Sequence, residues 1–164
     1  MKTLYLIRHA KSSWKYPELD DFERPLNKRG HRDAPIMGEF LIKINAIPDI
    51  IFSSPALRAC TTARILAEKI NYPLDQIQYS ESLYISGISG ILDFIHNIDD
   101  SKTSAAIVSH NPSLTQCANY LGNEQVSNIP TCGIFCLNLN IKKWKQIKEY
   151  CGELEFFEFP KMHI

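Results

Sequence analysis

The stretch LYLIRHAKSSW, residues Leu4–Trp14, decides the fold. Its first four residues are apolar, which is typical of a strand buried on both faces of a parallel sheet. Arg8 and His9 follow directly, so a cation and an ionisable ring stand at the carboxyl end of this strand. By itself, an Arg-His pair in this place is typical of a solvated strand end. It indicates a functional site only if other polar turns lie beside it.

Strands and helices are expected to alternate along the rest of the chain. Apolar runs predict strands at 3–8, 49–52, 77–79 and 105–109. Helical spacing predicts helices at 33–44, 55–70, 88–98 and 113–121, the first capped by Asp33 with Pro35 in its first turn and the second capped by Ser54. GIFCLNLN and WKQIKEY are expected to pair as a hairpin before the tail ELEFFEFPKMHI. This order predicts a three-layer α/β/α sandwich around a mainly parallel, mixed sheet.

Length, composition and charge predict one globular domain over residues 1–164. The 18 basic and 18 acidic side chains give a net charge of zero, which argues against a protein that binds nucleic acid through its overall field. No apolar run approaches the ~20 residues of a membrane-spanning helix. The short apolar run at the N-terminus also differs from a signal peptide. We therefore expect neither nucleic acid nor a membrane among its partners. The apolar residues of the C-terminal hairpin and of the FFEF tail leave a dimer open, but such residues more commonly pack against the domain's own core, so a monomer is expected.

The cysteines favour a cytoplasmic protein without a metal site. There are five, none spaced as CxxC, and three lie in apolar stretches where cysteine packs as a small hydrophobe. An odd number without a disulfide pattern is typical of a reducing compartment. The missing ligand spacing argues against metal.

Three polar turns are expected at one edge of the sheet, because the carboxyl ends of parallel strands meet there. They are Arg8-His9, the segment 53–55 with Arg58 one helical turn later, and the segment 109–112 with His110. Each alone is typical of a solvated surface, but their agreement favours a site. The three turns contain two arginines, two histidines and helix N-termini, and none contains a carboxylate. This set predicts a pocket for a dianion, with phosphoryl as the first candidate.

These motifs resemble the histidine phosphatase superfamily, which has the phosphoglycerate-mutase-like fold. RHA after the first strand, SSPALRACTTA after the second and SHNP after a late strand carry the resemblance. The small SixA-type branch of phosphohistidine phosphatases is the closer match, through ERPLNKRGHRDAPIMGEFL, the tryptophan-bearing hairpin and FEFPK. The resemblance covers nearly the whole chain and implies a phosphoglycerate-mutase-like sandwich.

The resemblance also implies a role for each side chain at the three turns. His9 would be the nucleophile that accepts the phosphoryl group on a ring nitrogen. Arg8 and Arg58 would hold the phosphoryl oxygens, and His110 would donate a hydrogen bond to the same group. Water would then hydrolyse the phosphohistidine intermediate, without metal or cofactor.

Two more residues are candidates for substrate binding. Arg24, in ERPLN, resembles an arginine near the phosphate in the small branch, although pairing with Asp20, Asp21 or Glu23 is an equally natural expectation. Asn111 follows the second histidine and either contacts the substrate or shapes the turn.

The sequence departs from the family pattern in three places. Ala10 stands where RHG has glycine and would be strained if its φ were positive. Lys15 replaces an asparagine of the mutase-like branch. The residues after Leu83 include no carboxylate, although many ester-cleaving members carry a proton-donating acid in this segment. Glu81 is the nearest possible acid.

The missing acid favours a P–N bond as the bond that is cleaved. General acid catalysis contributes about 10²–10⁴ in rate, and an alkoxide leaving group needs it. An imidazole, with a reference pKa of about 6.5, needs it less. Short connections also leave little chain for a lid over a small molecule.

Three functional hypotheses remain open at this stage. The leading one is a cytoplasmic, metal-independent phosphatase that acts on phosphohistidine in a phosphorylated protein. The second is a phosphomonoesterase of the same fold for a small phosphate ester, with Glu81 as its acid. The third is a module that binds phosphate without turnover, although such a module has no need of a nucleophile.

Overall fold

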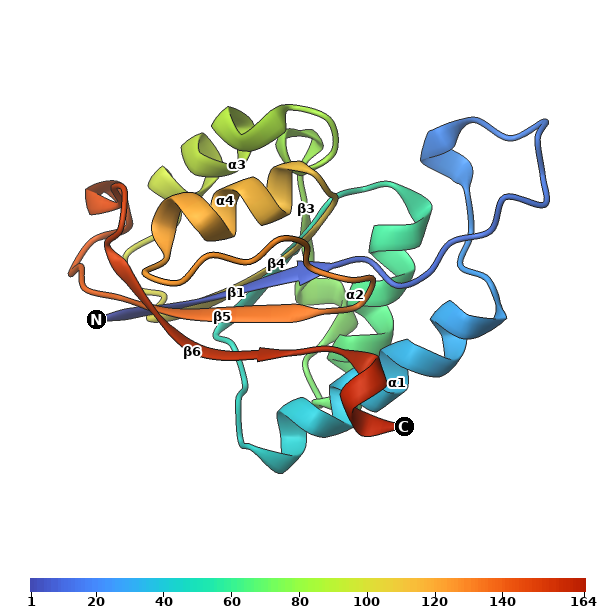
Figure 1. Cartoon of the computed structure of the whole chain (residues 1–164), viewed down its shortest axis with the longest axis horizontal. Coiled ribbons are helices and arrows are strands. Elements are labelled where there is room, and N and C mark those ends of the chain that lie inside the picture. Colours follow the sequence, from blue (N-terminus) through green and yellow to red (C-terminus); the bar gives the residue numbers. More distant parts are fainter.

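A six-stranded mixed sheet forms the centre of the protein (Figure 1). In the computed structural model, which describes residues 1–164, the strand order is β3-β2-β4-β1-β5-β6. The strands are β1 Lys2–Arg8, β2 Ile50–Ser53, β3 Gln78–Tyr79, β4 Ser104–Ser109, β5 Ile134–Leu139 and β6 Gly152–Glu158. The first four pair in parallel, and β5 and β6 form an antiparallel edge. The predicted mainly parallel, mixed sheet is confirmed.

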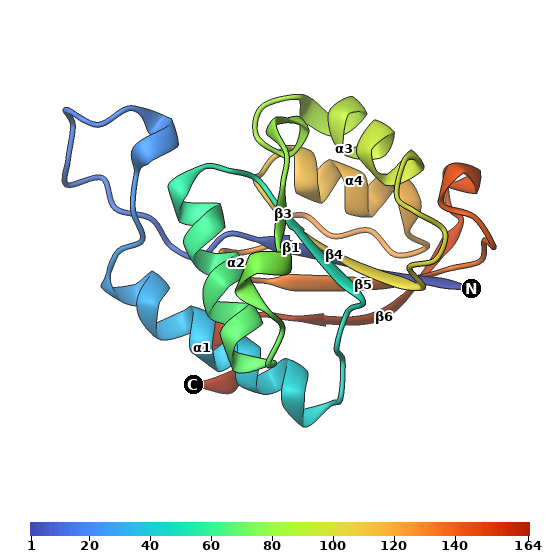
Figure 2. The same cartoon turned by 180° about the vertical axis from the view of Figure 1, so that it is seen from behind.

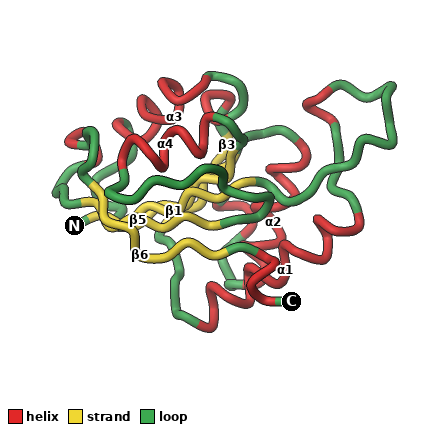
Figure 3. Tube along the Cα trace, viewed as in Figure 1, coloured by secondary structure: helices red, strands yellow, loops and turns green.

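Two helices cover each face of this sheet (Figures 1 and 2). Helices α1 (Lys28–Lys43) and α2 (Leu57–Lys69) lie on one face, and α3 (Gly87–His96) and α4 (Ser113–Leu121) lie on the other. The three layers are also clear in the trace coloured by secondary structure (Figure 3). None of the helices combines the length and hydropathy needed to cross a bilayer.

Strand β1 contributes to both hydrophobic cores, which explains its continuous apolar sequence. Leu4 and Leu6 belong to the core beneath α3 and α4, whereas Tyr5 and Ile7 belong to the core beneath α1 and α2. Successive side chains of a strand point to opposite faces, so all four residues are buried. Both layers therefore fix the direction in which Arg8 and His9 leave the sheet.

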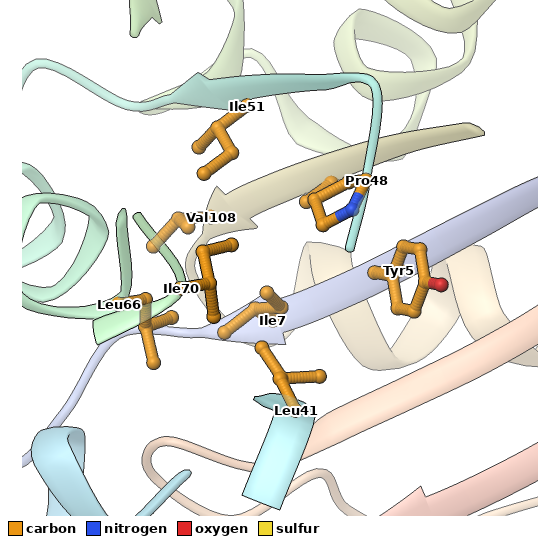
Figure 4. Close-up of a pocket in the computed structure, with 9 residues that line it drawn as sticks. Tyr5, Ile7, Leu41, Pro48, Ile51, Leu66, Ile70 and Val108 are labelled. Atoms are coloured by element: carbon orange, nitrogen blue, oxygen red, sulfur yellow. The ribbon is translucent and has the colours of Figure 1, made fainter. Parts of the chain in front are cut away.

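A small apolar cavity lies between the sheet and the helices α1 and α2 (Figure 4). Its volume is about 10 Å³, and side chains such as Ile7, Leu41 and Leu66 line it. A cavity of this size holds one water molecule at most, and its lining offers almost no polar partner. It is a gap in core packing rather than a ligand site.

Helix α1 begins earlier than the sequence predicted. Its N-cap is Asn27, whose Oδ1 accepts a hydrogen bond from the Gly30 N–H at 2.9 Å. Asp33, the expected cap, lies inside the helix with its side chain 1% exposed, between Arg29 at 3.5 Å and Arg32 at 2.9 Å. Pro35 is also internal to the helix. The prediction was wrong because the charged run after Asn27 looked like a loop, whereas its charges neutralise a buried carboxylate.

The C-terminal hairpin uses a different second strand. WKQIKEY is not a strand, because Trp144–Gln146 form a single 3-10 turn and the strand β6 begins at Gly152. Trp144 is fully buried, and its Nε1 donates to the carbonyl oxygen of Lys102 at 2.9 Å. The segment expected as a tail therefore supplies the edge strand β6. Trp144 packs instead beside the residues that precede β4.

Candidate active site

The three predicted turns meet in one pocket at the carboxyl edge of β1, β2 and β4. The pocket has a volume of about 210 Å³. Its lining consists of Arg8, His9, Lys11, Ser12, Trp14, Arg24, Arg58, His110, Asn111 and Thr131. Six of the seven candidate residues from the sequence are thus brought together. The seventh, Glu81, is exposed in the turn Glu81–Leu83 and does not line the pocket.

His9 is held in one tautomer by the backbone. Its Nδ1 lies 2.8 Å from the carbonyl oxygen of Ala10, which can only accept, so Nδ1 carries the proton and Nε2 keeps its lone pair. Burial above all, with the neighbouring His110, Arg58 and Arg8, lowers the pKa of His9 to about 3, against the raising effect of the Ala10 hydrogen bond. The ring is therefore neutral at pH 7, as a nitrogen nucleophile must be.

Ala10 fits the site without strain. Its side chain is fully buried, and its N–H donates to Thr62 Oγ1 at 2.9 Å. The residues with a positive φ are elsewhere in the chain. The methyl group that distinguishes RHA from RHG therefore costs no backbone strain here.

His110 faces His9 across the pocket, with 5.0 Å between the ring centroids. Its Nε2 lies 2.7 Å from Ser54 Oγ, and its buried Nδ1 has no hydrogen-bond partner within the protein. Burial above all, and then the charge of Arg58, lowers the pKa of His110 to about 4. A neutral His110 that accepts from the Ser54 hydroxyl carries its proton on Nδ1, where it can be donated to a ligand.

Ser54 serves this histidine rather than capping a helix. The helix α2 begins at Leu57 with Ala56 as N-cap, so the predicted cap was wrong by two residues. Ser54 Oγ accepts a longer bond from the Ala56 N–H at 3.2 Å. The Ser-Pro signal of a helix start thus also positions a side chain of the pocket.

Arg8 and Arg58 approach the pocket from β1 and from the first turn of α2. Arg8 donates through Nη1 to the Ile129 carbonyl oxygen at 3.1 Å, whereas its buried Nε has no partner. Arg58 is 6% exposed and donates to the main-chain oxygen of Asp21 at 2.6 Å and to its Oδ2 at 2.9 Å. Sequence reasoning considered Asp21 only as a partner of Arg24 and missed its contact with Arg58.

Arg24 is both a lining residue of the pocket and the partner of an acidic side chain. It lines the pocket, and its Nη1 pairs with Asp21 Oδ1 at 3.0 Å. Ser13 and Ser12 accept from its Nε and Nη2, and its guanidinium carbon lies 3.3 Å from the centre of the exposed Trp14 ring. The side chain is therefore fixed on several sides.

Asn111 lines the pocket, but its polar atoms are engaged with the protein. Its Nδ2 donates to Asn128 and to the Ile129 carbonyl oxygen, and its Oδ1 accepts from the N–H and hydroxyl of Thr115. These bonds anchor the start of α4. The arrangement favours a role in shaping the turn over a direct contact with substrate.

Tyr84 lies beside the pocket, against His110, and sequence reasoning did not select it. It follows Leu83, in the segment where ester-cleaving relatives were expected to carry an acid. Its hydroxyl donates to Asp21 Oδ2 at 2.7 Å, and its ring packs against that of His110 with centroids 5.5 Å apart. No local pattern indicates this contact, because Asp21 and Tyr84 are 63 residues apart.

Comparison with known proteins places this site in a class. The model of the histidine phosphatase superfamily (branch 1) matches residues 4–83, which include Arg8, His9 and Arg58. An uncharacterised protein of Mycobacterium leprae is 31% identical over 94% of this chain and 100% of its own length. The chain belongs to the histidine phosphatase superfamily.

Within the superfamily, the likeness extends over the whole chain to the small SixA-type branch. The crystal structure of a SixA protein from Agrobacterium tumefaciens is 27% identical, with a TM-score of 0.83 over 97% of this chain and 98% of the other. The protein histidine phosphatase SixA complexed with tungstate also has a TM-score of 0.83 over 98% of both chains, and at 18% identity it shows likeness of fold alone. Family and branch together support a phosphatase, a hydrolase of phosphorylated substrates.

Proposed function

We propose that this protein is a metal-independent phosphatase that forms a phosphoryl intermediate on His9 and removes phosphate from phosphohistidine in a protein. One observation carries the proposal. Three buried side-chain atoms lack a hydrogen-bond partner, namely Arg8 Nε, His110 Nδ1 and Thr131 Oγ1, and all three belong to residues that line the His9 pocket. Buried polar groups are nearly always paired, so the set favours a ligand with several acceptor oxygens beside the Nε2 of His9.

The proposed chemistry has two displacements. In the first, the lone pair of His9 Nε2 attacks phosphorus, and the bond from phosphorus to the substrate nitrogen breaks. The electron pair of that bond leaves with the substrate ring, which carries a proton on its other nitrogen and is therefore released as neutral imidazole. In the second, water attacks the same phosphorus, the bond to Nε2 breaks and phosphate is released. Arg8, Arg58 and His110 stabilise the charge on the transferred oxygens in both steps. The Ala10 carbonyl oxygen stabilises the positive ring that exists while Nε2 is phosphorylated.

The pocket lining supports a P–N bond as the bond that is cleaved. None of the ten lining residues is a carboxylic acid, so the pocket offers no carboxyl proton to an alkoxide. A volume of about 210 Å³ is also below the usual range of about 300–1,000 Å³ for pockets that enclose a whole small molecule. Both features suit a phosphoryl group presented on the surface of a protein.

The proposed enzyme is a single domain, 1–164, which acts as a monomer in the reducing environment of the cytoplasm. All five cysteines are free, and four of them are buried. The alternatives are a phosphomonoesterase for small esters and a binding module without turnover. Glu81 is exposed and does not line the pocket, which weighs against the phosphomonoesterase, because that alternative relied on Glu81 as its acid.

The test compares phosphate release from a phosphohistidine-bearing protein and from p-nitrophenyl phosphate, in a buffer that contains a metal chelator. The phosphoprotein is expected to be the better substrate, and His9→Ala is expected to lose activity on both. His31→Ala is the matched control, because His31 is an exposed histidine of α1 outside the pocket. Faster cleavage of the ester would favour the phosphomonoesterase, and tight phosphoprotein binding without release would favour the binding module.

A further inference from the structure

We propose that Asp21 is a positioning residue, which fixes the orientation of Arg24 and Arg58 for the transition state of phosphoryl transfer. The inference rests on the proposed function, because it concerns the same pocket. Asp21 begins the single 3-10 turn Asp21–Glu23 in the loop between β1 and α1. This loop projects beyond the end of the sheet (Figures 1 and 2).

One residue holds three guanidinium nitrogens of the pocket. Asp21 Oδ1 accepts from Arg24 Nη1 at 3.0 Å, and Oδ2 accepts from Arg58 Nη2 at 2.9 Å. The main-chain oxygen of Asp21 accepts from Arg58 Nη1 at 2.6 Å. Two bonds to the same residue fix the planar fork of Arg58. Each guanidinium has five N–H donors, so both arginines keep donors for a ligand.

The carboxylate of Asp21 bonds to the two arginines but does not itself line the pocket. The side chains of Arg24 and Arg58 are 10% and 8% exposed and line the pocket, whereas that of Asp21 is 51% exposed and does not. Asp21 therefore leaves the space for a phosphoryl group free. It acts on that group through the two arginines.

Tyr84 fixes the carboxylate in turn. Its hydroxyl donates to Asp21 Oδ2, and its ring packs between those of Phe22 at 5.3 Å and His110 at 5.5 Å. The network therefore joins the loop before α1, the first turn of α2 and the second histidine. Hydrogen bonds to charged groups are stronger than neutral ones, so this arrangement resists reorientation of either arginine.

The protonation state of Asp21 separates this role from acid catalysis. Partial burial raises its pKa, but the hydrogen bonds from Tyr84, Arg58 and Arg24 outweigh burial and hold the pKa of this carboxyl well below its usual range. Asp21 is ionised at neutral pH and has no proton to give to a leaving group.

Replacing this carboxylate by an amide has two opposite effects on oxyanions. Loss of a negative charge near the pocket removes a repulsion, so binding of tetrahedral phosphate stays equal or becomes tighter. Loss of the fixed arginine geometry weakens binding of a trigonal-bipyramidal species, whose oxygens need donors in defined places. A residue that only stabilised the fold would change both ligands alike.

The experiment measures the dissociation constants of inorganic phosphate and orthovanadate for wild type, Asp21→Asn and Asp20→Asn. Orthovanadate forms the five-coordinate mimic of the transition state. Asp20→Asn is the matched control, because it removes the same charge from the neighbouring residue. The side chain of Asp20 is exposed and lies outside the network. Asp21→Asn is expected to reduce the preference for vanadate over phosphate by about tenfold or more and to lower kcat in similar proportion without raising KM. Tyr84→Phe is expected to produce a smaller change in the same direction.

The possible results separate the two proposals. A wild type that does not prefer vanadate over phosphate would overturn the proposed function, whatever Asp21 does. A wild type with the preference and an Asp21→Asn variant that retains it would overturn the positioning role alone. Parallel weakening of both ligands, together with a lower Tm, would assign Asp21 to fold stability and also overturn the inference.

Discussion

At the scale of single residues, the hydrogen-bond partner of His9 sets its chemical character. Many catalytic histidines donate Nδ1–H to a carboxylate, which favours the charged ring and raises its pKa. His9 donates instead to the neutral carbonyl oxygen of Ala10. The carbonyl oxygen fixes the tautomer as a carboxylate would, but the ring stays neutral in a pocket lined by three arginines. This choice of partner suits a nucleophile better than a general base.

The protonation of His9 can be observed directly. Because its pKa is lowered to about 3, the neutral ring is expected to persist as pH falls from 8 to 5, with the proton on Nδ1 throughout. Nitrogen-15 NMR of the imidazole signals, assigned through His9→Ala, measures both tautomer and titration. A His9 signal that titrates near its ordinary value of about 6.5 would contradict the assignment.

Residue types at the site were predictable, but their mutual contacts were not. Arg8, His9, Arg58 and His110 follow strand ends, so topology alone brings them to one edge. Asp21 reaches Arg58 only through a loop whose path depends on tertiary packing, and its sequence neighbourhood is rich in other acids. The sequence left Asp20, Asp21 and Glu23 open as partners of Arg24, and the structure pairs Arg24 with Asp21.

At the scale of elements, the start of α1 is coupled to the pocket. The loop before it is closed by bonds from Ser13 N–H to the Pro25 carbonyl oxygen at 2.8 Å and from Asn27 N–H to that of Lys11 at 3.0 Å. Arg24 lies within this closed segment. The first turn of α1 packs so closely on it that a Cβ at Gly30 would lie 2.2 Å from the Lys11 oxygen.

Gly30→Ala tests this coupling, because the coupling decides whether the substitution raises or lowers the free energy of unfolding. On helix propensity alone, alanine would stabilise α1 by about 0.8–1.0 kcal/mol. The Lys11 oxygen belongs to the backbone, so it cannot move away as a flexible side chain could. Overpacking of this kind costs about 1–3 kcal/mol. We therefore expect a net loss of stability in urea unfolding, together with reduced phosphatase activity. A variant that is more stable than wild type and fully active would show that the loop and helix are not coupled.

Two of the errors in predicting elements have a common physical cause. Asp33 and Trp144 were interpreted from local pattern, as a cap and as a strand residue, whereas both are buried by contacts with distant or oppositely charged groups. Periodicity identified α2, α3 and α4, which each bury one face, and apolar runs identified β1, β2 and β4, whose residues are mostly buried. Local patterns fail where a buried polar contact decides the structure.

At the scale of the whole molecule, the pocket is assembled across the layers of the sandwich. His9 follows the central strand β1, Arg58 belongs to α2 on one face of the sheet, and His110 precedes α4 on the other face. The meeting of these residues at one edge was predictable, because parallel strands with alternating helices bring every such turn to the same edge. A ligand that contacts all three side chains must therefore hold both helical layers to the sheet.

Ligand binding is accordingly expected to stabilise the entire fold rather than one loop. At about 100 times its Kd, a ligand adds about 2.7 kcal/mol to the free energy of unfolding. For a domain of this size each kcal/mol raises Tm by about 2–4 °C, so orthovanadate is expected to raise Tm by about 5–10 °C in thermal unfolding followed by circular dichroism. Arg58→Ala is expected to lose the shift, whereas Arg64→Ala, at an exposed position of the same helix, is expected to keep it. An equal rise in Tm in both variants would mean that vanadate binds outside the pocket. The stabilisation would then not arise from contacts that join the two helical layers to the sheet.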